Sequence, residues 1–363
     1  MSKVNLCDIC DFQGGSQPPK SQWITLQQDG YIRMLQIRDF TQPGKVKAEY
    51  VKLTNTTKCC LKDDILIARY GASLGKILTG LSGAYNVAMT KAVPNEAVIS
   101  KKFLYYFLCS DTFKNCILNV GVRAAQAGFN KEDLSNIELY CPDLSIQNKI
   151  CKILELVDVL INKSKLQLDE LDLLVKSRFI EMFGDPVTNE KGWVKVRLAD
   201  KCCIITGNTP PRANEKYYGS YIEWIKSDNI TSSMYLTKAA EYLSEEGLAV
   251  GKKVESGSVL MTCIAGSLKS IGNVAIADRP VTFNQQINAV VTNEQNTLFM
   301  YEQFKLTKEY ITCDVNMALK GILSKGQLSE KQFIFPPIEL QNQFADFVVQ
   351  VDKSKFVITA KFQ

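Results

Sequence analysis

The chain repeats one pattern of residues after about 192 to 194 positions. Pro18-Pro19 returns as Pro210-Pro211, and Ala48-Glu49-Tyr50 returns as Ala240-Glu241-Tyr242, both 192 residues later. Further along, Ile146-Gln147-Asn148 matches Leu340-Gln341-Asn342 at an offset of 194. Solenoid repeats run about 20–50 residues, so this much longer period indicates one duplicated domain. A duplicated binding unit suggests a ligand with two related halves.

Length and composition place the chain among globular proteins of two or three domains, and the repeat makes the number two. Its 363 residues are enough for two separate cores, and 46% apolar with 22% charged residues is ordinary for a globular chain. No stretch approaches 18 consecutive apolar residues, and the first residues lack an apolar signal core. We therefore expect a cytoplasmic protein with reduced cysteines and no membrane partner.

The absence of histidine excludes many catalytic designs. Nucleophilic triads, His metal clusters and a His general base are impossible without an imidazole. The segment Gly71 to Ile77 resembles a phosphate loop, but it has three residues between its glycines and lacks the Ser or Thr that holds magnesium, so we interpret it as a turn after a strand. The carboxylate-x-lysine signature of many magnesium nucleases and the Asn-Pro-Pro-Tyr type of methylation motif are also missing. The sequence predicts a non-catalytic chain with no cofactor.

The twelve cysteines raise the alternative of a zinc site. Cys7 and Cys10 form a C-x-x-C pair that Cys59-Cys60 or Cys202-Cys203 would have to complete. Adjacent cysteines make a poor chelating pair, and the first pair is not kept in the second copy, where Ala199 replaces Cys7. We therefore predict no metal.

Each copy alternates apolar-rich runs typical of strands with one helical stretch. Strands are expected over 31–37 and 64–70, and again over 221–225 and 258–262; helices are expected over 101–120 and 298–315. The prediction is an α+β fold in which two duplicated domains are separated by long helices.

The clearest single element is a helix from Leu144 to Phe183, which Asp143 or Ser145 would cap and Gly184 with Pro186 would end. One apolar stripe, formed by Ile146, Ile150, Ile153, Val157, Leu160, Leu171 and Leu174, has coiled-coil spacing. Its natural partner is the second copy's helix, from Ile338 to about Phe356. Antiparallel pairing of the two would give a pseudo-twofold arrangement with one domain at each end. A flanking stripe of Leu154, Ile161, Leu168 and Val175 gives the helix a second apolar face to bury.

Two motifs within this organisation resemble a known family. Pro142 to Ile150 and the ending Met182-Phe183-Gly184-Asp185-Pro186 resemble the central conserved helix of specificity subunits from type I restriction-modification systems, and Pro336 to Gln343 resembles the start of their second helix. The resemblance implies a first target-recognition domain over 1–142, a spacer helix over 143–185, a second target-recognition domain over 186–336 and a second helix over 337–363 that is short or truncated. It further implies a bipartite double-stranded DNA target, two methyltransferase subunits as partners and an indirect link to a restriction and translocase subunit. The flanking stripe of Leu154, Ile161, Leu168 and Val175 is then the predicted docking surface for the methyltransferase subunits, with packing on the chain's own domains as an equal alternative.

Polar residues in loops are the candidate DNA contacts. The net charge of +5 is modest, so any basic surface must be local. Arginine suits guanine, whereas asparagine and glutamine suit adenine. In the first domain the candidates are Arg33, Gln36, Arg38, Arg69, Ser73, Lys76, Arg123 and Gln126; in the second they are Lys226, Asp228, Asn229, Ser267, Lys269, Lys320 and Lys325.

Two other functions remain open at this stage. A coiled-coil adaptor with two heads that bind proteins or glycans would show the same duplication. A DNA methyltransferase or nuclease that acts alone is disfavoured because its motifs are missing. The resemblance favours a DNA-specificity subunit.

Overall fold

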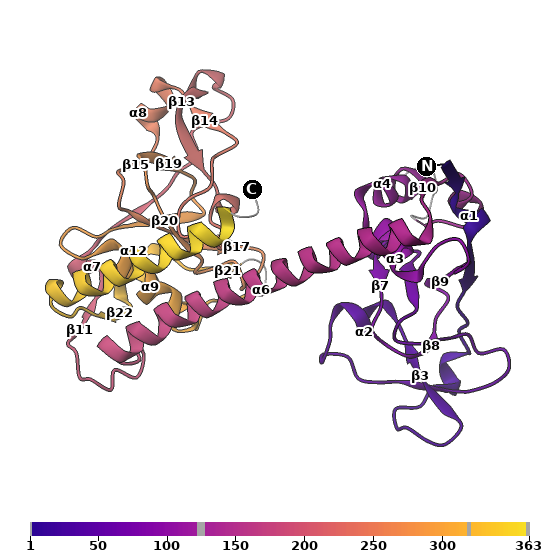
Figure 1. Cartoon of the computed structure of the whole chain (residues 1–363). Coiled ribbons are helices and arrows are strands. Elements are labelled where there is room, and N and C mark those ends of the chain that lie inside the picture. The colour runs from indigo at the N-terminus through magenta and orange to yellow at the C-terminus, as the bar shows by residue number, and fades with distance from the viewer. Residues whose placement is uncertain (1, 122–127, 318–320, 361–363) are drawn as a thin grey trace. The chain divides into compact units, whose positions relative to one another are not determined.

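The computed structural model describes residues 2–121, 128–317 and 321–360, and the chain divides into two compact units, residues 1–161 and 162–363 (Figure 1). Each unit mixes helices with antiparallel and parallel strands, so the predicted α+β class is confirmed. The division falls inside the long helix. The four-segment assignment and the pseudo-twofold arrangement stay predictions.

Unit 1 contains an antiparallel sheet next to its helices. Its strand order is β2 (Cys10–Gly14), β9 (Met89–Pro94), β6 (Ile65–Ala68), β7 (Ile77–Leu78). A two-stranded ladder joins β1 (Ser2–Asn5) to β10 (Glu138–Cys141). The helices of this part are α1 (Leu6–Ile9), α3 (Lys101–Cys109), α4 (Asp111–Gly121) and α5 (Lys131–Leu134). Leu104, Phe113 and Ile117 pack against Ile65 and Ile67 of the sheet to form the main core.

A second sheet of unit 1 has the order β4 (Tyr50–Lys52), β3 (Tyr31–Leu35), β8 (Gly83–Tyr85), β5 (Cys59–Cys60). Its central pair, β3 with β8, is parallel. The short helix α2 (Ile37–Thr41) follows β3. In Figure 1 these elements lie at the end of unit 1 away from its long helix, so we call this part the distal lobe of unit 1.

Unit 2 repeats both sheets with the same strand orders. Its inner sheet is β12 (Cys203–Thr206), β20 (Ile287–Val291), β16 (Val259–Thr262), β18 (Val274–Ile276). The sheet of its distal lobe is β14 (Tyr242–Leu243), β13 (Tyr218–Ile225), β19 (Val281–Phe283), β15 (Lys253–Val254), with β13 and β19 parallel. The remaining strands are β11 (Lys195–Arg197), β22 (Gln332–Ile334), β17 (Ile264–Ala265) and β21 (Gly321–Ile322), and the helices are α7 (Leu198–Lys201), α8 (Glu245–Val250), α9 (Thr297–Leu306), α10 (Lys308–Thr312) and α11 (Lys325–Glu330).

The single helices predicted over 101–120 and 298–315 are wrong in one respect, because each is broken in the middle. Ser110 separates α3 from α4, and Thr307 separates α9 from α10. The Ser110 hydroxyl donates to the Phe107 carbonyl at 2.7 Å, and the Thr307 hydroxyl donates to the Gln303 carbonyl at 2.7 Å. Such hydroxyls compete with the backbone for helical hydrogen bonds. Apolar periodicity continues through both breaks, which is why it did not reveal them.

The strand predicted over residues 31–37 is also too long at its C-terminal end. β3 ends at Leu35, and the Gln36 amide donates to the Asp39 carboxylate at 2.9 Å, which starts α2. The turn predicted after the second strand is confirmed. Residues 69–76 connect β6 to β7, and Gly71 and Gly75 there adopt φ of 71° and 75°, conformations that favour glycine.

The long helix α6 spans Leu144–Phe183, as predicted, and Gly184 follows it with φ of 75°. The second helix, α12, spans Ile338–Ala360 and is longer than predicted. Within unit 2, Phe344 packs on Phe179 and Phe183, while Lys355 pairs with Asp172. Residue numbers increase along α12 while those of the contacting residues of α6 decrease, so the two helices are antiparallel, as predicted.

At the start of each of these two helices, one buried glutamine forms hydrogen bonds to its own unit. Gln147 is fully buried; its amide nitrogen donates to the carbonyls of Val98 and Pro142 at 2.8 and 2.7 Å, and its oxygen accepts from the Ser100 amide at 2.8 Å. Gln341 does the same, donating to Pro336 at 2.8 Å and accepting from the Asn296 amide at 3.0 Å. Ser100 and Asn296 cap α3 and α9. One residue therefore ties two helices and the preceding proline together.

Close backbone contact makes glycine necessary where the chain passes between the two sheets. A Cβ at Gly15 would lie 2.1 Å from the Asn86 carbonyl oxygen, and one at Gly207 would lie 2.2 Å from that of Asn284. Their neighbours Ser16 and Asn208 donate backbone hydrogen bonds to Tyr85 and Phe283 at 3.0 Å each. The crossing is therefore built identically in both units.

No helix within the described ranges is long and apolar enough to span a membrane.

The substitution Gln341→Leu should lower the free energy of unfolding of unit 2 by about 2 to 4 kcal/mol, because it leaves the Asn296 amide and the Pro336 carbonyl without their partner. Thermal unfolding with hydrogen exchange resolved by unit would measure the loss. The matched control is Gln343→Leu on the same helix, at an exposed position, for which a change below about 0.5 kcal/mol is expected. Equal effects of the two substitutions would contradict the role given to the buried amide.

Candidate nucleic-acid interface

A cluster of cations surrounds one glutamate in the distal lobe of unit 1. Glu49 lies just before β4. Its carboxylate accepts hydrogen bonds from the Lys20 ammonium, from the side-chain amide of Gln36 at 3.0 Å and from the Arg38 guanidinium at 3.0 Å. The Lys20 ammonium also lies 3.8 Å from the centroid of the Trp23 ring. The side chains of Lys20 and Arg38 are 63% and 50% exposed, whereas that of Glu49 is 19% exposed. The glutamate thus holds cations that face solvent.

The same cluster occurs in the distal lobe of unit 2. Glu241, just before β14, pairs with Lys226 and lies 2.8 Å from the Arg212 guanidinium. The guanidinium of Arg212 stacks near the rings of Tyr218 and Trp224, with centroid distances of 4.5 and 4.9 Å. Because cations are attracted to aromatic faces, both rings help to orient Arg212.

Sequence reasoning missed four members of these clusters. They are Lys20, Glu49, Arg212 and Glu241, and the repeat itself contained the signal. Each cation directly follows a repeated Pro-Pro pair, and each glutamate is the centre of the repeated Ala-Glu-Tyr. Of the predicted residues, the structure brings Gln36 and Arg38 to one cluster and Lys226 to the other.

Two predicted contacts in the distal lobes are already used by the fold. Arg33 donates to the buried Asp39 carboxylate at 2.7 Å, although its side chain stays 35% exposed. Asn229 is 8% exposed; it accepts from the Lys226 amide at 3.0 Å and donates to the Lys238 carbonyl at 3.1 Å. Asn229 therefore uses its side-chain amide to shape its own turn, where it also donates to Thr237 at 3.3 Å, and its predicted base contact stays a prediction. Asp228 beside it is exposed and makes no hydrogen bond or ion pair with another described residue.

The candidates near β6 and β16 lie outside the clusters. Arg69 donates to the Phe129 carbonyl at 3.4 Å and lies over the Tyr70 ring at 5.1 Å. Lys76 is exposed and Ser73 half-buried in the turn before β7. The Ser267 hydroxyl accepts from the Lys269 amide at 3.3 Å, and Lys325 begins α11 in an exposed position. Three further candidates, Arg123, Gln126 and Lys320, lie outside the described residues.

The two glutamates are held in their ionised form. The hydrogen bond from Lys20 is the main cause that lowers the pKa of Glu49 below its ordinary value, with a further contribution from the Arg38 charge. The hydrogen bond from Lys226 does the same for the pKa of Glu241, and Arg212 adds to it. Each cluster therefore keeps its charges at neutral pH.

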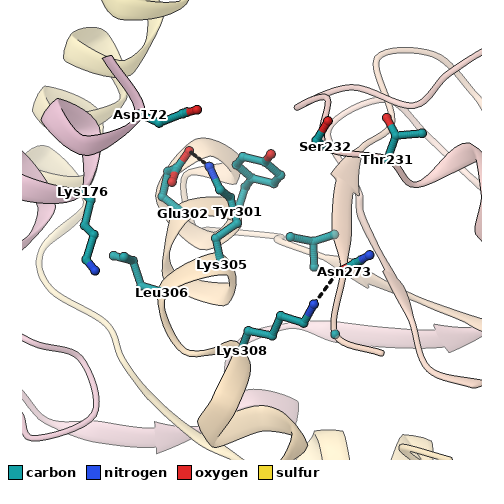
Figure 2. A pocket seen from close by; sticks show the side chains of 12 residues that line it. Asp172, Lys176, Thr231, Ser232, Asn273, Tyr301, Glu302, Lys305, Leu306 and Lys308 are labelled. Atoms are coloured by element: carbon teal, nitrogen blue, oxygen red, sulfur yellow. Dashed lines mark hydrogen bonds and ion pairs between the residues drawn. The ribbon is translucent and has the colours of Figure 1, made fainter. Parts of the chain in front are cut away.

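A polar cavity of about 600 Å³ lies in unit 2 beside α6 and α9 (Figure 2). Lys305 pairs with Glu302 at 3.1 Å, and Lys308 bonds to Asn273 and to the Lys269 carbonyl. Burial raises the pKa of Glu302 and lowers that of Lys308. Since these groups satisfy one another, we place the candidate interface at the distal lobes and not at this cavity.

Neither stripe of α6 is uniformly buried or exposed: of the predicted coiled-coil stripe, Ile146, Ile150 and Leu171 are half-buried, whereas Leu174 is 46% exposed. In the helix stretch of unit 1, the predicted coiled-coil residues Ile153, Val157 and Leu160 are 62%, 43% and 56% exposed. Of the predicted docking stripe, Leu154, Ile161 and Leu168 are half-buried, and Val175 is 4% exposed in the core of unit 2 with Val348 and Val351. Val175 thus packs on the chain's own domain and is not free for docking. The reason is that α12 contacts α6 on the side of Val175.

The cysteines are all free, and the described residues contain no group of three or more Cys, Asp or Glu placed to hold a metal ion. Burial raises the pKa of the Cys10 and Cys202 thiols to about 12 each.

Two copies of one α+β unit, each with the same charged cluster in its distal lobe, define a protein built from one duplicated domain. The sequence model of the family described as type I restriction modification DNA specificity domain matches residues 1–171 and, a second time, residues 190–362. The chain therefore belongs to this family.

Individual relatives agree with this assignment. The chain is 31% identical over 118 residues to the type I restriction enzyme HindI specificity subunit of Haemophilus influenzae, a match that covers 32% of this chain and 25% of that protein. It is 21% identical over 282 residues to the type I restriction enzyme MjaIX specificity subunit of Methanocaldococcus jannaschii, covering 72% of this chain and 65% of the relative. Less than two thirds of either relative's length is thus matched.

Solved structures show the same fold. The S subunit of a type I restriction-modification system from M. genitalium superposes with a TM-score of 0.55 at 15% identity, covering 99% of this chain and 91% of that one. A chain from a study of complex assembly and conformational transition of the type I R-M system gives a TM-score of 0.54 at 16% identity, with the same coverage.

The substitution Glu49→Gln should lower the free energy of unfolding of unit 1 near neutral pH by about 1 kcal/mol, since two exposed cations lose their partner. The folded-state pKa of Glu49 lies below its ordinary value of 4.5, so its stabilising effect is present above that pH and is lost as the pH falls below it. Urea unfolding in steps from about pH 7 to about pH 4 should therefore show the difference from wild type shrinking at the acid end.

The control is Glu96→Gln, at an exposed position without an ion pair to another described residue. It should show no such pH dependence. A constant difference between wild type and Glu49→Gln at every pH would refute the ionised cluster.

Proposed function

We propose that this chain is the sequence-specific DNA-recognition subunit of a type I restriction-modification complex. Each unit reads one half of a bipartite target through its distal lobe. The observation that carries the proposal is the equivalent cation cluster in both copies, Lys20 with Glu49 and Arg212 with Glu241, on a chain that the family model matches twice.

The chemistry of the clusters supports duplex DNA as the ligand. Phosphate oxygens need cations, and aromatic rings that flank those cations fix their direction. Exposed lysine and arginine side chains meet this need in both units without a large net charge. The adaptor alternative predicts no such cationic pair, and family membership also favours DNA.

The remaining parts of the proposal concern catalysis, location and the partner subunits. We propose that it is non-catalytic, that it acts in the cytoplasm and that two methyltransferase subunits dock on it, with a restriction and translocase subunit joining through them. The absence of histidine and of nucleotide-binding and nuclease motifs supports the first point. The exposed apolar residues Ile153, Leu156, Val157 and Leu160 of α6 offer a surface for docking.

Exchanging residues 1–142 for the first domain of another family member should change one half of the methylated target and leave the other half intact. The reason is that each unit has its own core and its own cluster. Methylome sequencing of cells that express the hybrid with its methyltransferase subunit would show the outcome. If both halves change together, the two-reader model is wrong.

The purified chain alone should neither methylate nor cleave DNA when S-adenosylmethionine, ATP and magnesium are supplied, because its sequence lacks histidine and the nucleotide-binding, methylation and nuclease motifs. Transfer of labelled methyl groups and gel analysis of plasmid DNA would measure this. The positive control is the same preparation with methyltransferase subunits added. Turnover by the isolated chain that is lost on mutation of one of its residues would overturn the assignment.

A further inference from the structure

The turn after β3 in unit 1 and the turn after β13 in unit 2 have the same backbone contacts. The Met34 amide donates to the Glu49 carbonyl at 2.8 Å, and the Trp224 amide donates to the Glu241 carbonyl at 3.0 Å. Two residues further along each chain segment, the backbone N–H of Gln36 donates to the Asp39 carboxylate, and the backbone N–H of Lys226 donates to the side-chain oxygen of Asn229. This register makes Gln36 equivalent to Lys226, and Arg38 equivalent to Asp228.

Side chains at equivalent places fall into two groups. The first group keeps its chemistry: Lys20 and Arg212 are cations over aromatic rings, and Glu49 and Glu241 are their acceptors. The second group changes: glutamine stands where the other copy has lysine, and Arg38 stands where the other copy has Asp228. Both Arg38 and Asp228 are exposed.

This division matches what two half-sites of a DNA target share and what they do not. Both halves present the same phosphate backbone, so a phosphate contact requires a cation in both units. Where the bases of the two halves differ, a base contact requires different side chains. A carboxylate is repelled by phosphate, and Asp228 therefore cannot serve the backbone, whereas it can accept a hydrogen bond from a base amino group.

We propose, on the assumption that the proposed function holds, that Arg38 and Asp228 are specificity-determining residues that read base edges in the two half-sites. Arg38 reads a guanine through its O6 and N7 atoms, and Asp228 accepts from the N4 amino group of a cytosine. Lys20 and Arg212 contact the flanking phosphates. Glu49 and Glu241 are positioning residues, which hold these cations without touching DNA.

The contacts of the two readers agree with this assignment. One terminal nitrogen of Arg38 bonds to Glu49 at 3.0 Å, which leaves the other N–H groups of its five donors for a ligand. Asp228 makes no hydrogen bond or ion pair with another described residue, although Lys226 and Arg212 belong to the cluster beside it. Its unshared oxygens remain available to an amino group.

The test uses the full chain expressed with its methyltransferase subunits, with methylome sequencing as the readout. The variants are Arg38→Ala, Arg38→Gln and Asp228→Ala. We expect Arg38→Ala to reduce discrimination at one guanine of one half-site by about tenfold, and Arg38→Gln to move the preference there toward adenine. Asp228→Ala should relax one cytosine of the other half-site. Each variant should leave the opposite half unchanged.

Matched controls are Lys45→Ala and Glu246→Gln, which alter exposed charges of the same units outside the clusters and should leave the target unchanged. If a variant no longer methylates, the purified complex is tested for binding to the wild-type target duplex and to duplexes with single base changes. Loss of discrimination at one position supports the proposal. Equal weakening on all duplexes, or an unchanged target in all three variants, overturns it.

The proposed function and the role of Arg38 and Asp228 can be contradicted separately. A wild-type complex that methylates no bipartite sequence contradicts the proposed function and the inference together. A wild-type complex with a bipartite target that Arg38 and Asp228 do not influence contradicts the inference alone.

Discussion

The rest of the structure depends on the buried amide that begins each long helix. Gln147 and Gln341 bond the first turn of α6 and α12 to the proline before the helix and to the cap of a neighbouring helix. A buried amide must find partners for its oxygen and its nitrogen, and few geometries satisfy both at once. This requirement holds the first turn of each helix against its own unit, α6 on unit 1 through Gln147 and α12 on unit 2 through Gln341.

The sequence was most informative where one residue pattern has one physical meaning. The duplication, the full extent of α6 and the glycine that ends it all followed from periodicity and from the steric freedom of glycine. Periodicity failed at Ser110 and Thr307, where a side-chain hydroxyl interrupts a helix without interrupting its apolar face. It also failed to rank the two stripes of α6, because both are apolar and only tertiary packing decides that Val175 is buried while Ile153 is exposed.

The charged clusters show why binding residues are harder to predict than cores. Glu49 and the cation that it holds are 29 residues apart, and no local pattern joins them. The repeat contained the missing information, since both partners stand next to residues that recur in the second copy. Loop candidates chosen by residue type alone included Asn229, whose amide is consumed by its own turn. Comparing two copies inside one chain therefore separates scaffold from variable surface without any alignment of relatives.

The glycines at the crossing between the two sheets have a consequence for how such a chain can change over generations. Any side chain at position 15 or 207 would collide with a carbonyl oxygen of the neighbouring strand end, so these two positions do not tolerate substitution. The exposed turns that carry Arg38 and Asp228 have no such contact. Tolerated substitutions therefore collect in the exposed turns and not at the crossing between the sheets. A descendant protein can change its binding specificity by single substitutions while its backbone stays the same.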